Sequence, residues 1–244
     1  MKKTLIAIGV LLSSITCFAQ EAPADTKNNT TTASTAPQAA PIELDKQYFA
    51  LPLEPSPDKE VVEFFSFNCP SCFKFESEYH APDAIAKALP KDTKFRRYHL
   101  EDFGPLAKEL AEAWAVANIL GIEDKVSDAL YKAIQTERKI KTADDIKAVF
   151  ADLGVDAEKF DKTKQNFLFK AFMAQQSDAI KQLRPGSIPT VFVNRKFFVN
   201  SRGLNTDNST DYVNDYARVT AYLVDLDPNI KIENNKETEG EAKK

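Results

Sequence analysis

A near-continuous run of β-branched and aromatic residues, positions 61–67, ends two residues before the tetrapeptide Cys69-Pro70-Ser71-Cys72. Such a run is typical of a strand that is covered on both faces. Asn68 interrupts it, Cys69 stands where a helix N-cap belongs, and Pro70 suits the first helical position. We therefore expect a buried central strand that leads directly into a helix reaching about Leu89, with both cysteines at the junction.

Apolar spacing predicts the order of the other elements. Short strands are expected at 48–51 and 94–100. Helical spacing then predicts a series of helices, at residues 106–120, 126–134, 142–153 and 157–183. Two strands follow at residues 190–193 and 197–199, joined by a tight connection without glycine at 194–196. A last helix is expected at 210–226. The order β-β-α-β, helices, β-β-α predicts an α/β protein with a thioredoxin fold interrupted by an all-helical insertion.

Composition suggests where the folded part begins and ends. Residues 20–41 are rich in Thr, Ala, Pro and Asn and hold no aliphatic residue larger than Ala, which predicts a flexible spacer. The charged residues 231–244 predict a disordered tail. Between them we expect a thioredoxin-like domain formed by 42–103 and 185–230, with the helical insertion at 104–184.

The first 19 residues have the pattern of a secretory signal peptide. Lys2 and Lys3 precede an apolar stretch at 5–15, and Ala19 offers a small residue for cleavage. The stretch is shorter than the about 20 residues that a membrane-spanning helix needs. We expect cleavage after Ala19; the alternatives are a buried N-terminal helix and a lipoprotein signal that retains Cys17.

The composition argues against several classes of function. Seven glycines form neither Gly-x-Gly-x-x-Gly nor Gly-Lys-Ser/Thr, which argues against nucleotide binding through those motifs. A net charge of −4 leaves no basic surface for nucleic acid. Structural zinc needs four ligands, and beside the two cysteines there is no second Cys-x-x-Cys motif. We therefore expect no cofactor, no metal and no nucleic-acid partner.

Two cysteines separated by two residues in an exported chain favour thiol–disulfide exchange. At a helix N-terminus the thiolate of Cys69 would face free backbone amides and the positive end of the helix dipole, which lowers its pKa. Cys72, one turn further, should be more buried and close the disulfide. A structural disulfide is a weak explanation because so small a loop restrains little chain entropy; two inert buried cysteines are the remaining alternative.

A wider set of segments carries a family resemblance: Val62-Glu63-Phe64-Phe65-Ser66-Phe67, Arg97-Tyr98-His99, Ala113-Trp114-Ala115-Val116-Ala117, Leu120-Gly121-Ile122-Glu123-Asp124-Lys125-Val126, Ala174-Gln175-Gln176 and Ile188-Pro189-Thr190-Val191-Phe192-Val193-Asn194. With the cysteine motif, they make the chain resemble the DsbA family of thiol oxidants from the periplasm of Gram-negative bacteria. The resemblance covers nearly all of the expected folded unit. It is therefore more specific than Cys-x-x-Cys alone.

The resemblance implies a periplasmic protein dithiol oxidase. Such an enzyme would donate the Cys69–Cys72 disulfide to reduced, unfolded exported proteins through a mixed disulfide at Cys69. It implies a quinone-linked membrane oxidant of the DsbB kind that restores the disulfide, and we expect a monomer. The alternatives are a disulfide isomerase or reductase of the same fold, and a non-catalytic peptide-binding chaperone or adhesion factor.

The resemblance also implies roles for single residues. Cys69 would be the attacking, solvent-facing cysteine and Cys72 the resolving one. Pro189 would be a cis-proline whose loop, with Ile188, pairs with the substrate backbone. Glu63 would be a buried proton acceptor beneath the disulfide; a carboxylate at a solvated strand end is the alternative.

Further residues belong to the expected surroundings of the cysteines. Arg97 stands where the family often has a lysine partner for the buried carboxylate. His99 would lie in a wall near the site, whereas Trp114 on a helical stripe is most simply core. Pro70 and Ser71 replace the family's familiar Pro-His. Because the Ser71 hydroxyl is a neutral donor, we expect a weaker oxidant than the Pro-His members.

Overall fold

The structure, a computed structural model, describes residues 40–229. The predicted signal peptide 1–19, nearly all of the predicted spacer 20–41 and the predicted tail 231–244 lie outside the described residues. The helices and strands all belong to the unit that begins at Pro41.

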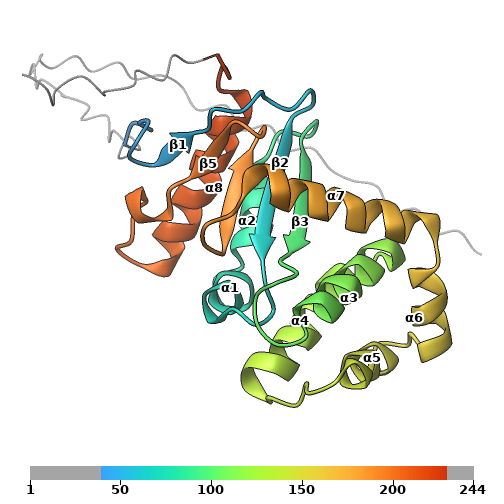
Figure 1. Ribbon diagram of the computed structural model, residues 1–244. Helices are drawn as coiled ribbons and strands as arrows, with labels where there is room; N and C mark the ends of the chain where they lie inside the picture. The colour runs from blue at the N-terminus through green and yellow to red at the C-terminus, as the bar shows by residue number, and fades with distance from the viewer. Residues whose placement is uncertain (1–39, 230–244) are drawn as a thin grey trace, which may run out of the picture. The chain divides into compact units, whose positions relative to one another are not determined.

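Five strands form one mixed sheet in the order β1-β5-β4-β2-β3 (Figure 1). Their bounds are Tyr48–Ala50 (β1), Glu60–Phe65 (β2), Lys94–His99 (β3), Thr190–Val193 (β4) and Phe197–Val199 (β5). Strand β2 pairs in parallel with β3 and antiparallel with β4. Its residues 61–65 are all buried, which confirms the prediction of a central strand covered on both faces.

Helices cover both faces of the sheet. Helix α2 (Ala81–Ala88) and helix α8 (Ser209–Asp225) lie on one face, where Ile85 and Val219 pack with Val61 of β2. Helix α7 (Phe167–Leu183) crosses the opposite face, where Leu183 packs with Val62 (Figure 1). The alternation of side chains along β2 thus supplies both cores.

The helix after the cysteines is interrupted, which corrects the prediction of one helix over 70–89. Helix α1 (Pro70–Phe73) continues into a π-helical turn, η1 (Lys74–Glu78), and the chain then breaks at His80 before α2. His80 has a φ of 52°, in the left-handed region. Pro82 explains the break, because proline donates no backbone hydrogen bond and suits the first turn of a new helix.

The predicted helical insertion lies between β3 and β4. Its elements are α3 (Ala107–Leu120), α4 (Glu123–Tyr131), the π-helical turn η2 (Lys132–Thr136), α5 (Ala143–Asp152), α6 (Ala157–Lys164) and α7. Gly121 ends α3 with a φ of 65°, as its position predicts. Thr142 and Asp145 form the predicted capping box of α5. The stretch 157–183 divides at Asn166, which caps α7.

The β4–β5 connection makes its turn without glycine. Asn194 and Arg195 have φ angles of 50° and 56°, as a type I′ turn requires at its two central residues. The Asn194 side chain accepts a hydrogen bond from the amide of Glu60 at 3.0 Å and donates one to the carbonyl of Val224 at 2.9 Å. These bonds offset the conformational cost of a residue other than glycine at this place.

The cysteines lie where the sheet meets the helical insertion. Cys69 and Cys72 share one hydrophobic cluster with Phe67 of the strand-to-helix turn and with Trp114 of α3. Over residues 40–229, none of the helices is both long and apolar enough to cross a membrane.

Candidate redox site

Cys69 is the N-cap of α1. Its backbone is extended, with φ −91° and ψ 115°, and its Sγ accepts a hydrogen bond from the backbone amide of Cys72 at 3.3 Å. Pro70 occupies the start of the helix, where the missing N–H costs nothing. The strand-to-helix junction predicted from the sequence therefore places a sulfur at the amide-rich end of a helix.

The pKa of one thiol is lowered and that of the other is raised. The hydrogen bond with the Cys72 side chain, together with the amides of Cys72 and Ser71, lowers the pKa of Cys69 to about 6 although burial opposes the shift. Burial raises the pKa of Cys72 far above its usual range, and the neighbouring Cys69 and Glu63 raise it further. At neutral pH the reduced site therefore holds a thiolate at Cys69 and a thiol at Cys72.

The expectation that Cys69 faces solvent is wrong for this structure. Cys69 is 4% exposed and Cys72 is 1% exposed, so both are buried, although their order is as expected. The loop before β4 covers the first cysteine, because the Ile188 carbonyl oxygen lies 3.7 Å from the Cys69 Sγ. The Ile188–Pro189 peptide bond is cis, and the two cysteines are in the free dithiol form.

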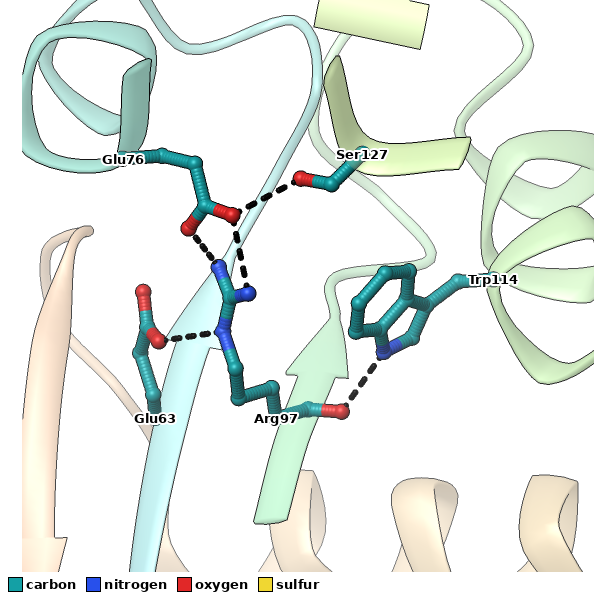
Figure 2. Close-up of polar contacts among 5 residues, drawn as sticks. All are labelled: Glu63, Glu76, Arg97, Trp114 and Ser127. Carbon is teal, nitrogen blue, oxygen red and sulfur yellow. Dashed lines mark hydrogen bonds and ion pairs between the residues drawn. The ribbon is translucent and has the colours of Figure 1, made fainter. Parts of the chain in front are cut away.

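Glu63 lies in the middle of β2 and is 1% exposed, so the alternative of a solvated strand end is wrong. Arg97 occupies the paired position on β3, and its Nε donates to Oε2 of Glu63 at 2.6 Å (Figure 2). Burial raises the pKa of Glu63 to about 7 although Arg97 opposes the shift, and the nearby carboxylate of Glu76 adds to it. The site thus contains a carboxyl group that gains and loses protons near neutral pH.

Glu76 is a member of this cluster that the sequence analysis missed. Both terminal nitrogens of Arg97 donate to its carboxylate, and the Ser127 hydroxyl of α4 donates to its Oε1 at 2.9 Å (Figure 2). Its position four residues after Cys72, on the same side of the helix, was the available signal. Arg97 uses two nitrogens for Glu76 and a third for Glu63, and a lysine ammonium lacks this planar fork of donors, so Arg97 is not equivalent to a lysine here.

Trp114 belongs to the core, as expected, and also holds Arg97. It is 1% exposed, and its Nε1 donates to the Arg97 carbonyl at 2.7 Å (Figure 2). The guanidinium carbon lies 5.4 Å from the Trp114 ring centroid and 5.0 Å from that of Phe65. Although burial alone would lower the pKa of Arg97, Glu63 and Glu76 raise it, so the group stays charged.

His99 lies in the buried core and contacts the turn before Cys69, so the expectation that it lies in a wall near the site is wrong. It is fully buried, and its Nε2 accepts a hydrogen bond from the amide of Phe67 at 3.0 Å. Burial lowers its pKa to about 3, so the ring is neutral and able to accept that bond. The side chain of Gln176 on α7 in turn accepts from the His99 amide at 3.1 Å. His99 therefore positions the turn that leads to Cys69.

A groove of about 560 Å³ opens beside the cysteine motif. Its lining comes from the active-site helix, the loop before β4, the segment between β5 and α8, and the start of α8: Ser71, Lys74, Phe75, Tyr79, Ser187, Ile188, Pro189, Ser201, Arg202, Thr206, Asn208, Ser209 and Tyr212. Within residues 40–229 no three His, Cys, Asp or Glu side chains are grouped so as to hold a metal ion.

A thiolate at a helix N-terminus, a buried partner thiol and a groove beside them define a thiol:disulfide oxidoreductase built on the thioredoxin fold. Residues 60–209 match the family described as the DSBA-like thioredoxin domain. The chain belongs to the DsbA family.

Individual relatives agree with this assignment. The thiol:disulfide interchange protein DsbA of Dickeya dadantii is 45% identical over 188 residues, which cover 76% of this chain and 90% of the relative. The crystal structure of DsbA from Klebsiella pneumoniae is 34% identical, with a TM-score of 0.73 over 77% of this chain and all of that chain. A cysteine-to-serine variant of Proteus mirabilis DsbA with a non-covalently bound peptide is 36% identical, with a TM-score of 0.72 over 76% and 99% of the two chains.

Proposed function

We propose that the chain is a periplasmic protein dithiol oxidase that donates the Cys69–Cys72 disulfide to reduced exported proteins. The observation that carries the proposal is that the pKa of Cys69 is lowered whereas that of Cys72 is raised. A thiolate at Cys69 stabilises the reduced form, and whatever stabilises the reduced form makes the disulfide a stronger oxidant. The peptide bound to Proteus mirabilis DsbA supports protein segments as substrates.

The first step forms a mixed disulfide. A thiolate of the substrate attacks Sγ of Cys69, a new sulfur–sulfur bond forms, and the Cys69–Cys72 bond breaks. Cys72 leaves as a thiolate and takes up a proton, because its raised pKa favours the thiol. Glu63, with a pKa of about 7, is the nearby group that supplies this proton.

The second step releases the product. A second thiolate of the substrate attacks the substrate sulfur of the mixed disulfide, and Cys69 leaves as the thiolate that the helix terminus stabilises. The substrate thereby loses two electrons and gains a disulfide, while the enzyme becomes a dithiol. In the reverse direction, Glu63 accepts the proton of Cys72 when an external oxidant restores the disulfide.

The neighbouring residues act through position and charge. Ile188 and Pro189 form the loop on which the substrate backbone lies, next to the Cys69 sulfur. Pro70 and Ser71 tune the thiolate from the first turn of the helix. Arg97 holds Glu63 in place, and His99 supports the turn before Cys69.

Turnover requires an oxidant, and we assign that role to a quinone-linked membrane protein of the DsbB kind. A signal peptide at residues 1–19 would carry the chain to the periplasm, where the enzyme would act as a monomer. Disulfides form and persist in that compartment, which suits a donor of disulfides.

The decisive test is oxidative refolding of a reduced disulfide protein with catalytic amounts of this enzyme and a terminal oxidant. We expect several turnovers with the wild type and none with Cys69→Ser. Trapping of thiols in cells separates an oxidase, found mainly as the disulfide, from an isomerase or reductase, found mainly as the dithiol. A chaperone without redox function would accelerate refolding equally well after Cys69→Ser, and that result would contradict the proposal.

A further inference from the structure

The charged side chains that line the groove beside the cysteines are all cationic. Lys74 and Arg202 line it, and its lining contains no acidic residue. Both side chains belong to exposed residues, and neither forms an ion pair within the described part of the chain. Two cationic groups in a concave lining that holds no carboxylate favour a positive potential there, which an anionic ligand would complement.

The two charges stand on different walls. Lys74 begins η1, two residues after Cys72, so it belongs to the segment that carries the reacting sulfurs. Arg202 lies in η3 (Ser201–Gly203), the short 3₁₀ turn that follows β5. A ligand that reaches the cysteines along the groove therefore passes between segments that are more than 120 positions apart in the sequence.

The wall that carries Arg202 is held in place. The Asn200 side chain donates to the carbonyl of Lys46 at 2.6 Å, and the Asn200 amide donates to the carbonyl of Gln47 at 2.9 Å. A Cβ on Gly203 would overlap the Lys46 carbonyl oxygen, so only glycine permits this close approach. The groove is therefore preformed, which reduces the entropy lost when a ligand binds.

The rest of the lining suits an extended peptide segment. Tyr79 and Tyr212 offer aromatic surface, and the serine, threonine and asparagine side chains offer hydrogen-bond donors and acceptors. Ile188 and Pro189 connect this surface to the Cys69 sulfur. When a segment binds there, the side chains next to its cysteine lie between the wall that carries Lys74 and the wall that carries Arg202.

We propose that this groove selects cysteine-containing segments that carry an acidic side chain next to the reacting cysteine. Carboxylates within reach of Lys74 and Arg202 would favour binding, whereas lysine or arginine at the same place would be repelled. An exposed ion pair contributes about 1.5- to 5-fold in affinity, so two cations yield roughly 2- to 25-fold discrimination. The inference rests on the proposed oxidase function, because it names the substrate class of the same site.

The test uses three dithiol peptides that differ only at the residue after the first cysteine: Asp, Asn or Lys. The oxidised full-length protein is mixed with each peptide, quenched with acid, and the oxidised peptide is measured by mass spectrometry. We expect rates in the order Asp, Asn, Lys, with an Asp-to-Lys ratio of about 3 to 10 at low salt. At about 1 M NaCl, where screening acts over about 3 Å, the ratio should fall towards the value that a groove without the two cations gives.

Two variants of equal total charge separate the groove from the rest of the surface. The double variant Lys74→Glu/Arg202→Glu should reverse the order of Asp and Lys peptides. Lys162→Glu/Lys170→Glu, which reverses two exposed lysines on α6 and α7, should keep the wild-type order. The neutral pair Lys74→Gln/Arg202→Gln should lower the ratio to the value set by the peptides' own thiols, even if the charge-reversed protein folds poorly.

Ratios of rates are compared because an acidic or basic neighbour also changes the reactivity of the peptide's own thiol, equally for every protein variant. An Asp-to-Lys ratio that stays the same in the glutamine pair as in the wild type would overturn this inference while the oxidase function stands. Failure of the wild type to oxidise the Asn peptide would overturn the proposed function itself, and the inference with it.

Discussion

The backbone amide of Cys72 donates a hydrogen bond to Sγ of Cys69 at 3.3 Å, so Cys72 helps to stabilise the anion of Cys69. The relationship follows from the N-cap position of Cys69, because the side chain of an N-cap accepts from an amide two or three residues later. In most helices that acceptor is an oxygen. Here it is a sulfur, and the bond makes the reduced state of the enzyme more stable.

This geometry predicts a thiolate at neutral pH. The pKa of Cys69, lowered to about 6 first by the Cys72 side chain and then by the amides of Cys72 and Ser71, leaves roughly nine-tenths of it ionised at pH 7. Ultraviolet absorbance of the reduced protein at 240 nm should titrate with a midpoint near pH 6. Cys69→Ser should lack this transition, and a wild-type midpoint near 9 would show that the bond does not stabilise the anion.

The same shift predicts how the stability of the reduced protein depends on pH. Because the folded pKa of Cys69, about 6, lies below the ordinary value of 9.0, its contribution is complete above pH 9 and disappears as the pH falls through 6. Between pH 8 and pH 5 the reduced wild type should lose about 2–3 kcal/mol relative to Cys69→Ser. Denaturant unfolding of both proteins under reducing conditions measures the difference.

That comparison removes the effect of Glu63. Its raised pKa, about 7, works in the opposite direction, since it favours the folded state as the pH falls towards 4.5. Both proteins contain Glu63, so its contribution cancels to first order. Equal losses in wild type and Cys69→Ser would contradict the prediction.

Ser71→His should make the enzyme a stronger oxidant. A histidine at this exposed position adds a positive charge and a charged donor beside the Cys69 thiolate, worth about 1.5 kcal/mol or more, and so roughly tenfold in the thiol–disulfide equilibrium. Equilibration with glutathione at pH 7 measures the change. Ser71→Ala, which removes the neutral donor, is the control. A Ser71→His variant whose equilibrium with glutathione is unchanged or more reducing would contradict this prediction.

Glu63→Gln should slow substrate oxidation about 100-fold at pH 7, because Cys72 then leaves without a nearby proton donor. The wild-type rate should rise with pH and bend downward near pH 7, where Glu63 loses its proton, whereas the glutamine variant should lack the bend. Single-turnover rates from pH 5.5 to 8.5 test this. Glu158→Gln, an exposed carboxylate on α6, is the matched control. A bend that persists in Glu63→Gln would assign it to another group.

Gly203→Ala should destabilise the protein by about 1–3 kcal/mol, because its Cβ would overlap the carbonyl oxygen of Lys46 and force the backbone apart. Gly186→Ala, which meets nothing within 4 Å, should change stability by less than about 0.5 kcal/mol. Denaturant unfolding of the oxidised proteins measures both. Equal stability of the two variants would mean that the 200–203 segment moves away without cost.

Local sequence signals predicted the elements well wherever the physical cause is itself local. The N-cap at Cys69, the capping box of Thr142 and Asp145, and the helix end at Gly121 each depend on residues within a few positions of one another. The break at His80 had a local cause too, namely Pro82, and the helical pattern on both sides concealed it.

Contacts between distant segments could not be predicted from local sequence signals. The Cys69 sulfur is covered by Ile188, 119 positions further along the chain, so its burial was not visible in its neighbours. Arg97 joins Glu63 to Glu76 across 34 and 21 positions, and Ser127 contacts Glu76 across 51. No periodicity or spacing relates these residues.

Two cysteines at a strand-to-helix junction are enough to specify the kind of chemistry, because local backbone preferences alone bring them to a helix terminus. How strongly each group holds its proton depends instead on the folded chain. A pKa responds to burial and to charges that arrive from distant segments, as Glu63 and Cys72 demonstrate. The shape and charge of the groove likewise exist only once η1, the loop before β4, η3 and the start of α8 have come together, so no single stretch of sequence contains them.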